Sequence, residues 1–231
     1  MSSGRSSTRA RPADRLADDV AALRGYLAGV EEIGLFPLGI VLLPTEVVPL
    51  HVFEHRYKEL IGDCLELGRE FGLVYADEEG VRETGTRARV ADVLDRLDEG
   101  RLNILVEGTE RFHVERLTRG RSFLTAEVEP FEDEWAEPDA EEAARVVEAF
   151  RALAAVAGAQ TDPPEAGPGR LSFAVAARVE IAPEAKQELL ELRSETARLA
   201  RLRELLDAAR EGILAAKRLG EQAKKNGSRP S

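Results

Sequence analysis

Cysteine, methionine and tryptophan each occur once among the 231 residues, and aromatic residues make up only 5% of the chain. Because Cys64 is the only cysteine, an internal disulfide is impossible and a zinc site built on several cysteines is excluded. No apolar run approaches the roughly 18 residues that a membrane-spanning helix needs. The first ten residues are polar and basic, unlike a secretory signal. We therefore expect a cytoplasmic protein that makes no membrane contact.

Motifs for nucleotide binding and covalent chemistry are also missing. The sequence contains no Gly-x-x-x-x-Gly-Lys-Ser/Thr phosphate loop. Its serines and threonines form no recognisable nucleophile elbow. Cys64 falls on an apolar helix face, where we expect a buried, inert thiol rather than a nucleophile. His113 has no evident partner in the sequence. We therefore predict no cofactor and no catalytic residue.

The net charge is strongly acidic, −11 overall, but it is unevenly distributed. Residues 1–15 carry four Arg and one Asp, and residues 217–231 carry five basic residues and one Glu. The residues between these two ends therefore hold all of the acidic excess. A body of this sign repels phosphate backbones, which makes general nucleic-acid binding unfavourable. The basic ends are expected to be solvated and disordered.

Short apolar runs separated by turn residues predict a β-rich segment over residues 33–131. Strands are predicted over residues 35–38, 40–43, 47–53, 71–76, 88–97, 101–107 and 123–131. Pro49 lies inside the third of these, which should therefore be an edge or bulged strand. Asp98-Glu99-Gly100 indicates a hairpin turn. Several short strands with one helix among them suggest a small mixed barrel closed on itself.

The helix within this segment follows from spacing. Its apolar residues fall at offsets of 0, 3, 4, 7 and 8, which places them on one helical face: Tyr57, Leu60, Ile61, Cys64 and Leu65. Gly68 is placed to end the helix.

After residue 131 the apolar period becomes helical. Asp139 is a capping residue, Pro183 occupies a favoured first position, and Ser194 is an N-cap. Short helices are expected over 171–179 and from Pro183, and a long one from Ser194. The chain is thus divided into an N-terminal extension (1–32), a β-rich part (33–131), an acidic linker (132–138), a helical part (139–218) and a flexible tail (219–231). The extension can hold a short amphipathic helix built on Leu16, Val20, Leu23 and Leu27.

An ordered series of motifs over residues 33–210 resembles the N-terminal, substrate-binding domain of Lon proteases. That family shows a Leu-Phe-Pro-Leu-like strand, a proline-containing apolar strand, and a Leu-Pro-Leu-His-Ile-Phe-Glu-Pro-Arg-Tyr-like stretch. Gly-Thr, an Asp-Gly-Arg turn, Gly-x-x-Arg-Phe and Lys-Gln-x-Leu-Leu-Glu follow. The matching positions here are 35–38, 41–44, 48–57, 85–86, 99–101, 108–112 and 186–191. His55 departs from the pattern, in which proline is usual.

The resemblance implies an α+β protein, with an N-terminal PUA-like pseudo-β-barrel containing one helix and a C-terminal helical bundle. It also implies a non-catalytic module that binds unfolded or exposed polypeptide, in a stand-alone form that lacks the ATPase and peptidase modules. An adaptor or chaperone-like role in protein quality control follows, with a protease or ATPase in trans as a partner. The motif residues expected to be structural are Phe36, Pro37, Pro49, Glu54, Arg56, Tyr57, Gly85, Gly108, Arg111 and Phe112.

Residues 51–55, His-Val-Phe-Glu-His, match the His-x-x-Glu-His pattern of zinc hydrolases. In that pattern two histidines on one helix face bind zinc and the glutamate, here Glu54, is the general base. Pro49 and the β-branched context instead place His51 on a strand end, and the helical face begins only at Tyr57. We therefore predict no metal site. A zinc-dependent hydrolase using His51, Glu54 and His55 is kept as an alternative function, and RNA binding by the PUA-like barrel is another.

A polypeptide-binding role requires exposed apolar surface or a free strand edge. The first candidate is the rim formed by residues 47–53, with Val48, Leu50 and Phe53 as contact residues. The second candidate is the cleft between the two halves. There Trp135 either anchors a ligand across the cleft or pins the linker to the body. The sequence does not choose between these two surfaces.

Overall fold

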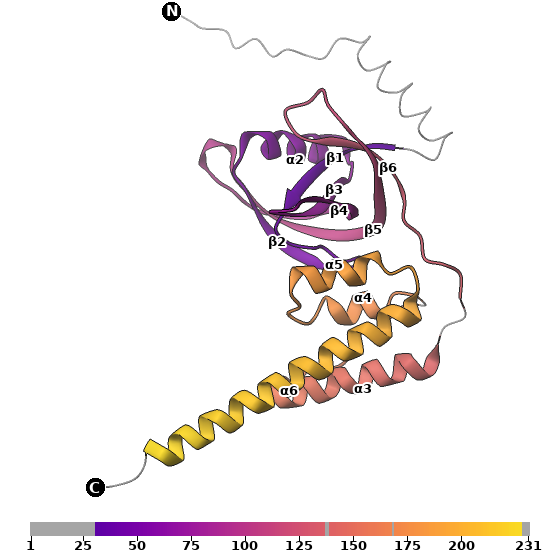
Figure 1. The fold of residues 1–231 in the computed structure, drawn as a ribbon. Helices are drawn as coiled ribbons and strands as arrows, with labels where there is room; N and C mark the ends of the chain where they lie inside the picture. The colour runs from indigo at the N-terminus through magenta and orange to yellow at the C-terminus, as the bar shows by residue number, and fades with distance from the viewer. Residues whose placement is uncertain (1–30, 137–138, 168, 228–231) are drawn as a thin grey trace, which may run out of the picture.

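The computed structural model describes residues 31–136, 139–167 and 169–227. The β-rich half contains β1 (Glu31–Leu38), β2 (Val47–Val52), α2 (His55–Leu67), β3 (Phe71–Asp77), β4 (Gly80–Arg96), a 3₁₀ turn (Asp98–Gly100), β5 (Leu102–Thr118) and β6 (Thr125–Pro130). The helical half contains α3 (Ala140–Ala157), α4 (Leu171–Ala176), α5 (Pro183–Glu191) and α6 (Glu195–Gly227). In Figure 1 the short helices α4 and α5 lie between the sheet and the paired helices α3 and α6.

The six strands form one mixed sheet in the order β2-β5-β4-β3-β1-β6. β1 and β3 run parallel, and the other neighbouring strands are antiparallel. β6 also pairs with the far end of β5, from Phe112 to Thr118, so the sheet closes into a ring. This ring-like mixed sheet, with one helix among its strands and packed helices after it, confirms the predicted α+β class.

β2 lies at the edge of the sheet, as Pro49 predicted. Together with residues 102–107 of β5 and residues 89–96 of β4, it forms a unit that we call the three-stranded lobe. The inner face of the lobe packs against the apolar stripe of α2. The side chains in this core include Val52, Leu102, Ile104 and Val106 from the strands and Tyr57, Leu60, Ile61 and Cys64 from the helix.

The predicted end of α2 and four of the five residues of its stripe are confirmed, whereas Leu65, the fifth, is exposed. Tyr57, Leu60, Ile61 and Cys64 are buried, and Gly68 adopts a left-handed conformation with φ of 63° at the C-terminal cap. The hairpin turn is also confirmed, because Asp98–Gly100 joins β4 to β5. The helix therefore covers only the inner face of the lobe and leaves the opposite face bare.

The prediction of a strand over residues 40–43 is wrong. The chain turns sharply there, and Thr45 adopts a left-handed φ of 70°. Backbone groups of residues 42 and 43 form hydrogen bonds with side chains instead of with a neighbouring strand. The Leu43 N–H donates to Glu46 Oε2 (2.9 Å), and Thr86 Oγ1 donates to the Leu42 carbonyl oxygen (2.6 Å). An apolar run can therefore be buried without entering the sheet.

The helical half follows the predicted capping residues. Asp139 Oδ1 accepts hydrogen bonds from the N–H groups of Glu141 and Glu142, and Pro183 opens α5. Ser194 Oγ accepts from the Ala197 N–H (3.3 Å) at the start of α6. α4 ends at Ala176, earlier than predicted, and α6 continues to Gly227. The predicted helix over Leu16–Leu27 lies outside the described residues.

The two halves share one apolar core. Val41, Leu43 and Tyr75 from the β-rich half belong to the cluster that α3, α4, α5 and α6 build. In the described part of the chain, no helix is both long and apolar enough to cross a membrane. Apolar burial where the two halves meet, which we call the seam, makes them a single packed unit. It also fixes the orientation of the three-stranded lobe relative to the helices.

Candidate functional site

The outer face of the three-stranded lobe carries side chains in three rows that cross β2, β5 and β4. Strand register sets these rows as Val47–Glu107–Arg89, Pro49–Leu105–Asp92 and His51–Asn103–Asp95. The β2 end of the face is apolar and exposed. Val47 is 51% exposed, and Phe53, which follows β2 directly, is 59% exposed. The face therefore grades from apolar groups on β2 to carboxylates on β4.

The free edge of β2 offers few hydrogen-bond donors. The Gly108 N–H donates to the Glu46 carbonyl oxygen (2.9 Å), so residue 46 belongs to a hydrogen-bonded pair. Antiparallel pairs alternate, which turns the backbone groups of Val47, Pro49 and His51 away from β5. Proline has no N–H, so the centre of this edge presents only carbonyl oxygens. The strand edge is thereby protected from continuous pairing, while its side chains stay accessible.

His51 is held in place by a polar chain that spans the lobe. Its Nδ1 lies 2.7 Å from Asn103 Oδ1, and Asn103 Nδ2 donates to Asp95 Oδ2 (3.1 Å). Because the amide oxygen only accepts, His51 Nδ1 carries the proton. The His51 ring also stacks on Phe53, with the ring centroids 5.7 Å apart. These contacts orient both rings on the outer face.

The His-x-x-Glu-His pattern does not form the arrangement that zinc hydrolases need. His51 lies on β2, whereas His55 opens α2, so the two histidines do not share a helix face. Glu54 accepts hydrogen bonds from Arg56 (2.9 Å from Nε). Among residues 31–136, 139–167 and 169–227, no three His, Cys, Asp or Glu side chains are grouped to hold a metal ion.

The predicted rim residues separate into two groups. Val48 and Leu50 are half-buried and pack against the core beneath the lobe, whereas Phe53 is exposed. Exposure on the outer face identifies Val47 and Pro49 in their place. Strand alternation determines which residues of β2 face outward, because only every second residue of a strand faces the same side.

Charged side chains, and not Trp135, join the linker to the two halves. Trp135 is 90% exposed, so it does not pin the linker to the body, and its role as a ligand contact stays a prediction. Asp133, two residues earlier, lies between two arginines. Its Oδ1 and Oδ2 accept from Nη1 (2.6 Å) and Nη2 (2.5 Å) of Arg198 on α6. It also accepts from Arg111 on β5. We call these three residues the linker clasp.

Both arginines of the linker clasp are buried, and Arg198 is fully so. Arg111 Nη1 donates to the carbonyl oxygens of Leu190 (2.7 Å) and Leu192 (2.8 Å). Burial lowers the pKa of Arg111 to about 10, and Asp133 opposes that shift. Arg111 therefore stays protonated at neutral pH. The sequence signal for Arg198 was its place in the apolar stripe of α6, one turn before Leu202.

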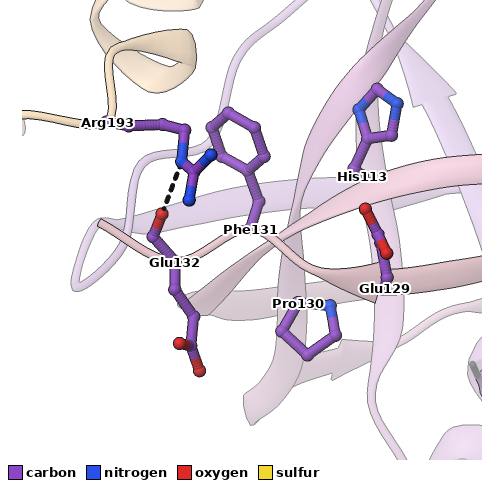
Figure 2. A pocket seen from close by; sticks show the side chains of 6 residues that line it. All are labelled: His113, Glu129, Pro130, Phe131, Glu132 and Arg193. Carbon is purple, nitrogen blue, oxygen red and sulfur yellow. Dashed lines mark hydrogen bonds between the residues drawn. The ribbon is translucent and has the colours of Figure 1, made fainter. Parts of the chain in front are cut away.

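Two hollows lie along the seam beside this clasp. The first, with a volume of about 280 Å³, has Phe131 as its wall with Arg193 and His113 on either side (Figure 2). Arg193 Nε donates to the Glu132 carbonyl oxygen (3.0 Å), which holds the guanidinium against the Phe131 ring. The second, about 210 Å³, is lined by both Phe131 and Phe173. Both hollows are small and lined by mixed charges.

Two further contacts tie α5 to the β-rich half. Lys186 Nζ lies 2.5 Å from Glu46 Oε1, in an ion pair whose side chains are both mostly buried. Gln187 Nε2 donates to the Thr84 carbonyl oxygen (3.1 Å). Because Glu46 immediately precedes β2, the first contact fixes the position of the lobe relative to the helices.

The only cysteine is unsuited to nucleophilic chemistry. Cys64 is buried in the core beneath the lobe. Burial raises the pKa of its thiol to about 11, so almost no thiolate exists at neutral pH. His113 faces the first hollow, and its Nδ1 is buried with no hydrogen-bond partner among the described residues.

Comparison with known families decides the classification. The model of the ATP-dependent protease La (LON) substrate-binding domain matches residues 32–208. The chain belongs to this family. The Lon substrate-binding domain is non-catalytic, and no ATPase or peptidase module aligns with this chain.

Lon proteases from several bacteria are similar to the chain. The Lon protease of Anaeromyxobacter dehalogenans is 30% identical over 188 residues, covering 74% of this chain and 22% of that protein. The Lon protease of Escherichia coli is 26% identical over 214 residues, covering 84% of this chain and 27% of that protein. The chain therefore spans about a quarter of the length of these relatives.

Solved structures of Lon domains share the fold. A Lon N-terminal domain protein from Xanthomonas campestris superimposes with a TM-score of 0.60 at 28% identity, covering 74% of this chain and 96% of that one. The N-terminal domain of Mycobacterium avium complex Lon protease gives a TM-score of 0.58 at 21% identity, covering 77% and 98%, and supports the fold alone.

The Lon family motifs fall at contacts within this fold. Phe36 stacks on Tyr57 with the ring centroids 4.0 Å apart. The guanidinium of Arg56 lies over the Tyr57 ring, 4.5 Å from its centroid. Phe112 is fully buried. A Cβ atom on Gly108 would lie 2.2 Å from the Leu43 carbonyl oxygen, so only glycine permits this approach. The remaining motif positions are Pro37 on β1, Pro49 on β2 and Gly85 on β4, where a Cβ would lie 2.6 Å from Phe112.

Proposed function

We propose that this Lon substrate-binding domain binds unfolded polypeptide on the outer face of the three-stranded lobe. The observation that supports the proposal is the exposed apolar surface of β2, where Val47 and Phe53 are each more than half exposed. Exposed apolar groups gathered on one sheet face are typical of interaction sites. The inner face of the same lobe packs against α2, so the outer face is the one that is free to bind.

Side chains, more than backbone pairing, carry this binding. A polypeptide added as a strand along β2 would find no N–H donor at Pro49. Apolar side chains of the ligand can instead pack on Val47, Pro49 and Phe53 and on Leu105 in the neighbouring strand. Such packing depends on apolar area and little on sequence, which suits the recognition of many unfolded chains.

The seam hollows are less suited to this role. Each is small and lined by charged groups, and the chain around them is locked by the linker clasp. Opening this cleft for an extended polypeptide would break buried ion pairs. RNA binding is also disfavoured on the lobe, because its outer face carries Asp92 and Asp95 in a body of net negative charge.

The test is a fluorescence-anisotropy titration of a labelled, permanently unfolded polypeptide, with a folded protein as the comparison probe. The wild-type protein should bind the unfolded probe saturably and the folded one not at all. Replacing Val47→Ser and Phe53→Ser together should weaken binding about ten- to thirtyfold, because each loses roughly 1 kcal/mol of apolar burial.

The matched control is Leu67→Ser. Leu67 lies in the last turn of α2 and is 54% exposed, comparable to Val47 and Phe53. It should bind the probe as the wild type does. Equal losses in the control and in the double variant, or an unfolded probe that never saturates, would contradict the proposal.

A further inference from the structure

The outer face of the lobe has a charge pattern as well as an apolar one. Asp92 and Asp95 stand at the β4 end of their rows, beside Leu105 and Asn103. Asp92 Oδ1 accepts only the Val93 N–H (2.8 Å), and Asp95 accepts from the Asn103 amide. Neither carboxylate forms a salt bridge with any of the described residues.

The nearby arginines either form other hydrogen bonds or ion pairs, or lie on the inner face of the lobe. Arg89 pairs with Glu107 in the first row, which leaves that row neutral. Arg96 is opposite Leu102, so its side chain belongs to the other face of the strand. Arg101 Nε donates to the Asp98 carbonyl oxygen at the hairpin tip. Two carboxylates without an ion-pair partner among the described residues therefore border the apolar surface.

The spacing lets one ligand reach both kinds of group. Neighbouring strands lie about 4.8 Å apart, so β2 and β4 are about 10 Å apart across β5. A segment whose apolar side chains pack on Pro49 and Leu105 can extend a lysine or arginine toward Asp92 or Asp95. An acidic side chain in the same place would meet like charge at close range.

We propose that this face selects unfolded segments in which apolar residues adjoin lysine or arginine over segments in which they adjoin acidic residues. The inference rests on the proposed function, since it assigns the charge preference of the same face. Asp92 and Asp95 are the residues that determine the preference.

Two unfolded probes of equal length and identical apolar residues test this, one with lysine and one with glutamate at every charged position. At low ionic strength the wild-type protein should bind the lysine probe about three- to tenfold more tightly. Asp92→Asn with Asp95→Asn should remove most of that ratio. Both residues are exposed, so the fold should be unaffected.

A control of equal net charge separates the local effect from the acidity of the whole chain. Glu148→Gln with Glu211→Gln removes two exposed carboxylates from α3 and α6, the helices that α4 and α5 separate from the sheet (Figure 1). This control should keep the wild-type ratio. A control that loses as much as the lobe variant, or equal affinity of the wild type for both probes, would overturn the inference while the proposed function stands. Failure of both probes to bind would instead overturn the proposed function.

Discussion

Asp133 offers the sharpest test of how the two halves are held together. Its carboxylate accepts three hydrogen bonds from two arginines, one on β5 and one on α6. Replacing Asp133→Asn keeps the shape of the side chain but removes its charge. One of its two acceptor oxygens also becomes an amide that points donors at guanidinium donors.

The expected cost follows from burial. Removing one partner of a buried ion pair typically costs about 3–5 kcal/mol. Asp133 is 30% exposed at its side chain, and both arginines keep carbonyl acceptors. Arg198 also keeps Glu195 (2.7 Å). We therefore expect a loss at the low end, about 3 kcal/mol, which lowers the melting temperature by roughly 6–12 °C for a chain of this size.

Urea unfolding followed by far-ultraviolet circular dichroism measures this loss, with a thermal melt beside it. Glu134→Gln is the matched control, because it removes a neighbouring, exposed carboxylate from the same linker. It should stay within about 0.5 kcal/mol of the wild type. An Asp133→Asn variant that is as stable as the control would refute the reasoning that the linker clasp joins the halves.

Three further predictions concern single positions. Gly108→Ala should cost about 2 kcal/mol or more in urea unfolding, because its Cβ would collide with the Leu43 carbonyl, whereas Gly39→Ala, where a Cβ meets nothing within 4 Å, should be neutral. The pKa of Glu142 is lowered chiefly by its hydrogen bond from Arg203 on α6. Its contribution to the free energy of unfolding is therefore present above about pH 4.5 and is lost as the pH falls through the pKa of the folded state. Glu142→Gln should therefore flatten the acid limb of the stability–pH curve, and an unchanged limb would contradict this. Cys64 should react with a thiol reagent at pH 8 about a hundredfold more slowly in the native state than in urea, from ionisation alone, and equal rates would disprove its burial.

Much of the fold could be predicted because local signals agreed with the tertiary structure. The stripe from Tyr57 to Cys64 identified a helix with one buried face. Pro49 identified an edge strand, because proline cannot complete a central ladder. Asp139, Pro183 and Ser194 marked helix starts through caps that depend only on nearby residues.

The parts that failed depend on contacts distant in sequence. The apolar run at residues 40–43 is buried, but a turn held by Glu46 and Thr86 replaces the strand. The linker is fixed by Asp133, and this needs two arginines that are 22 and 65 residues away. Trp135 is exposed and Arg198 is buried, the reverse of the usual hydrophobic order, so composition alone did not indicate that Asp133 holds the linker.

The candidate site was half visible in the sequence. The segment 47–53 was identified as the rim, but the residues that face outward depend on the register of β2 with β5. Asp92 and Asp95 could not be placed, since β-bulges in β4 shift the pairing just before each of them. A one-residue change of register would have placed the charges on the inner face.

Hydrogen–deuterium exchange of the protein, with and without a saturating unfolded polypeptide, tests the central claim most directly. Bound polypeptide should slow exchange in residues 47–53 and 103–107, which form the outer face of the three-stranded lobe. Exchange in residues 130–133 and 193, at the seam, should stay unchanged. Protection confined to the seam, or none in the lobe at saturation, would contradict the account.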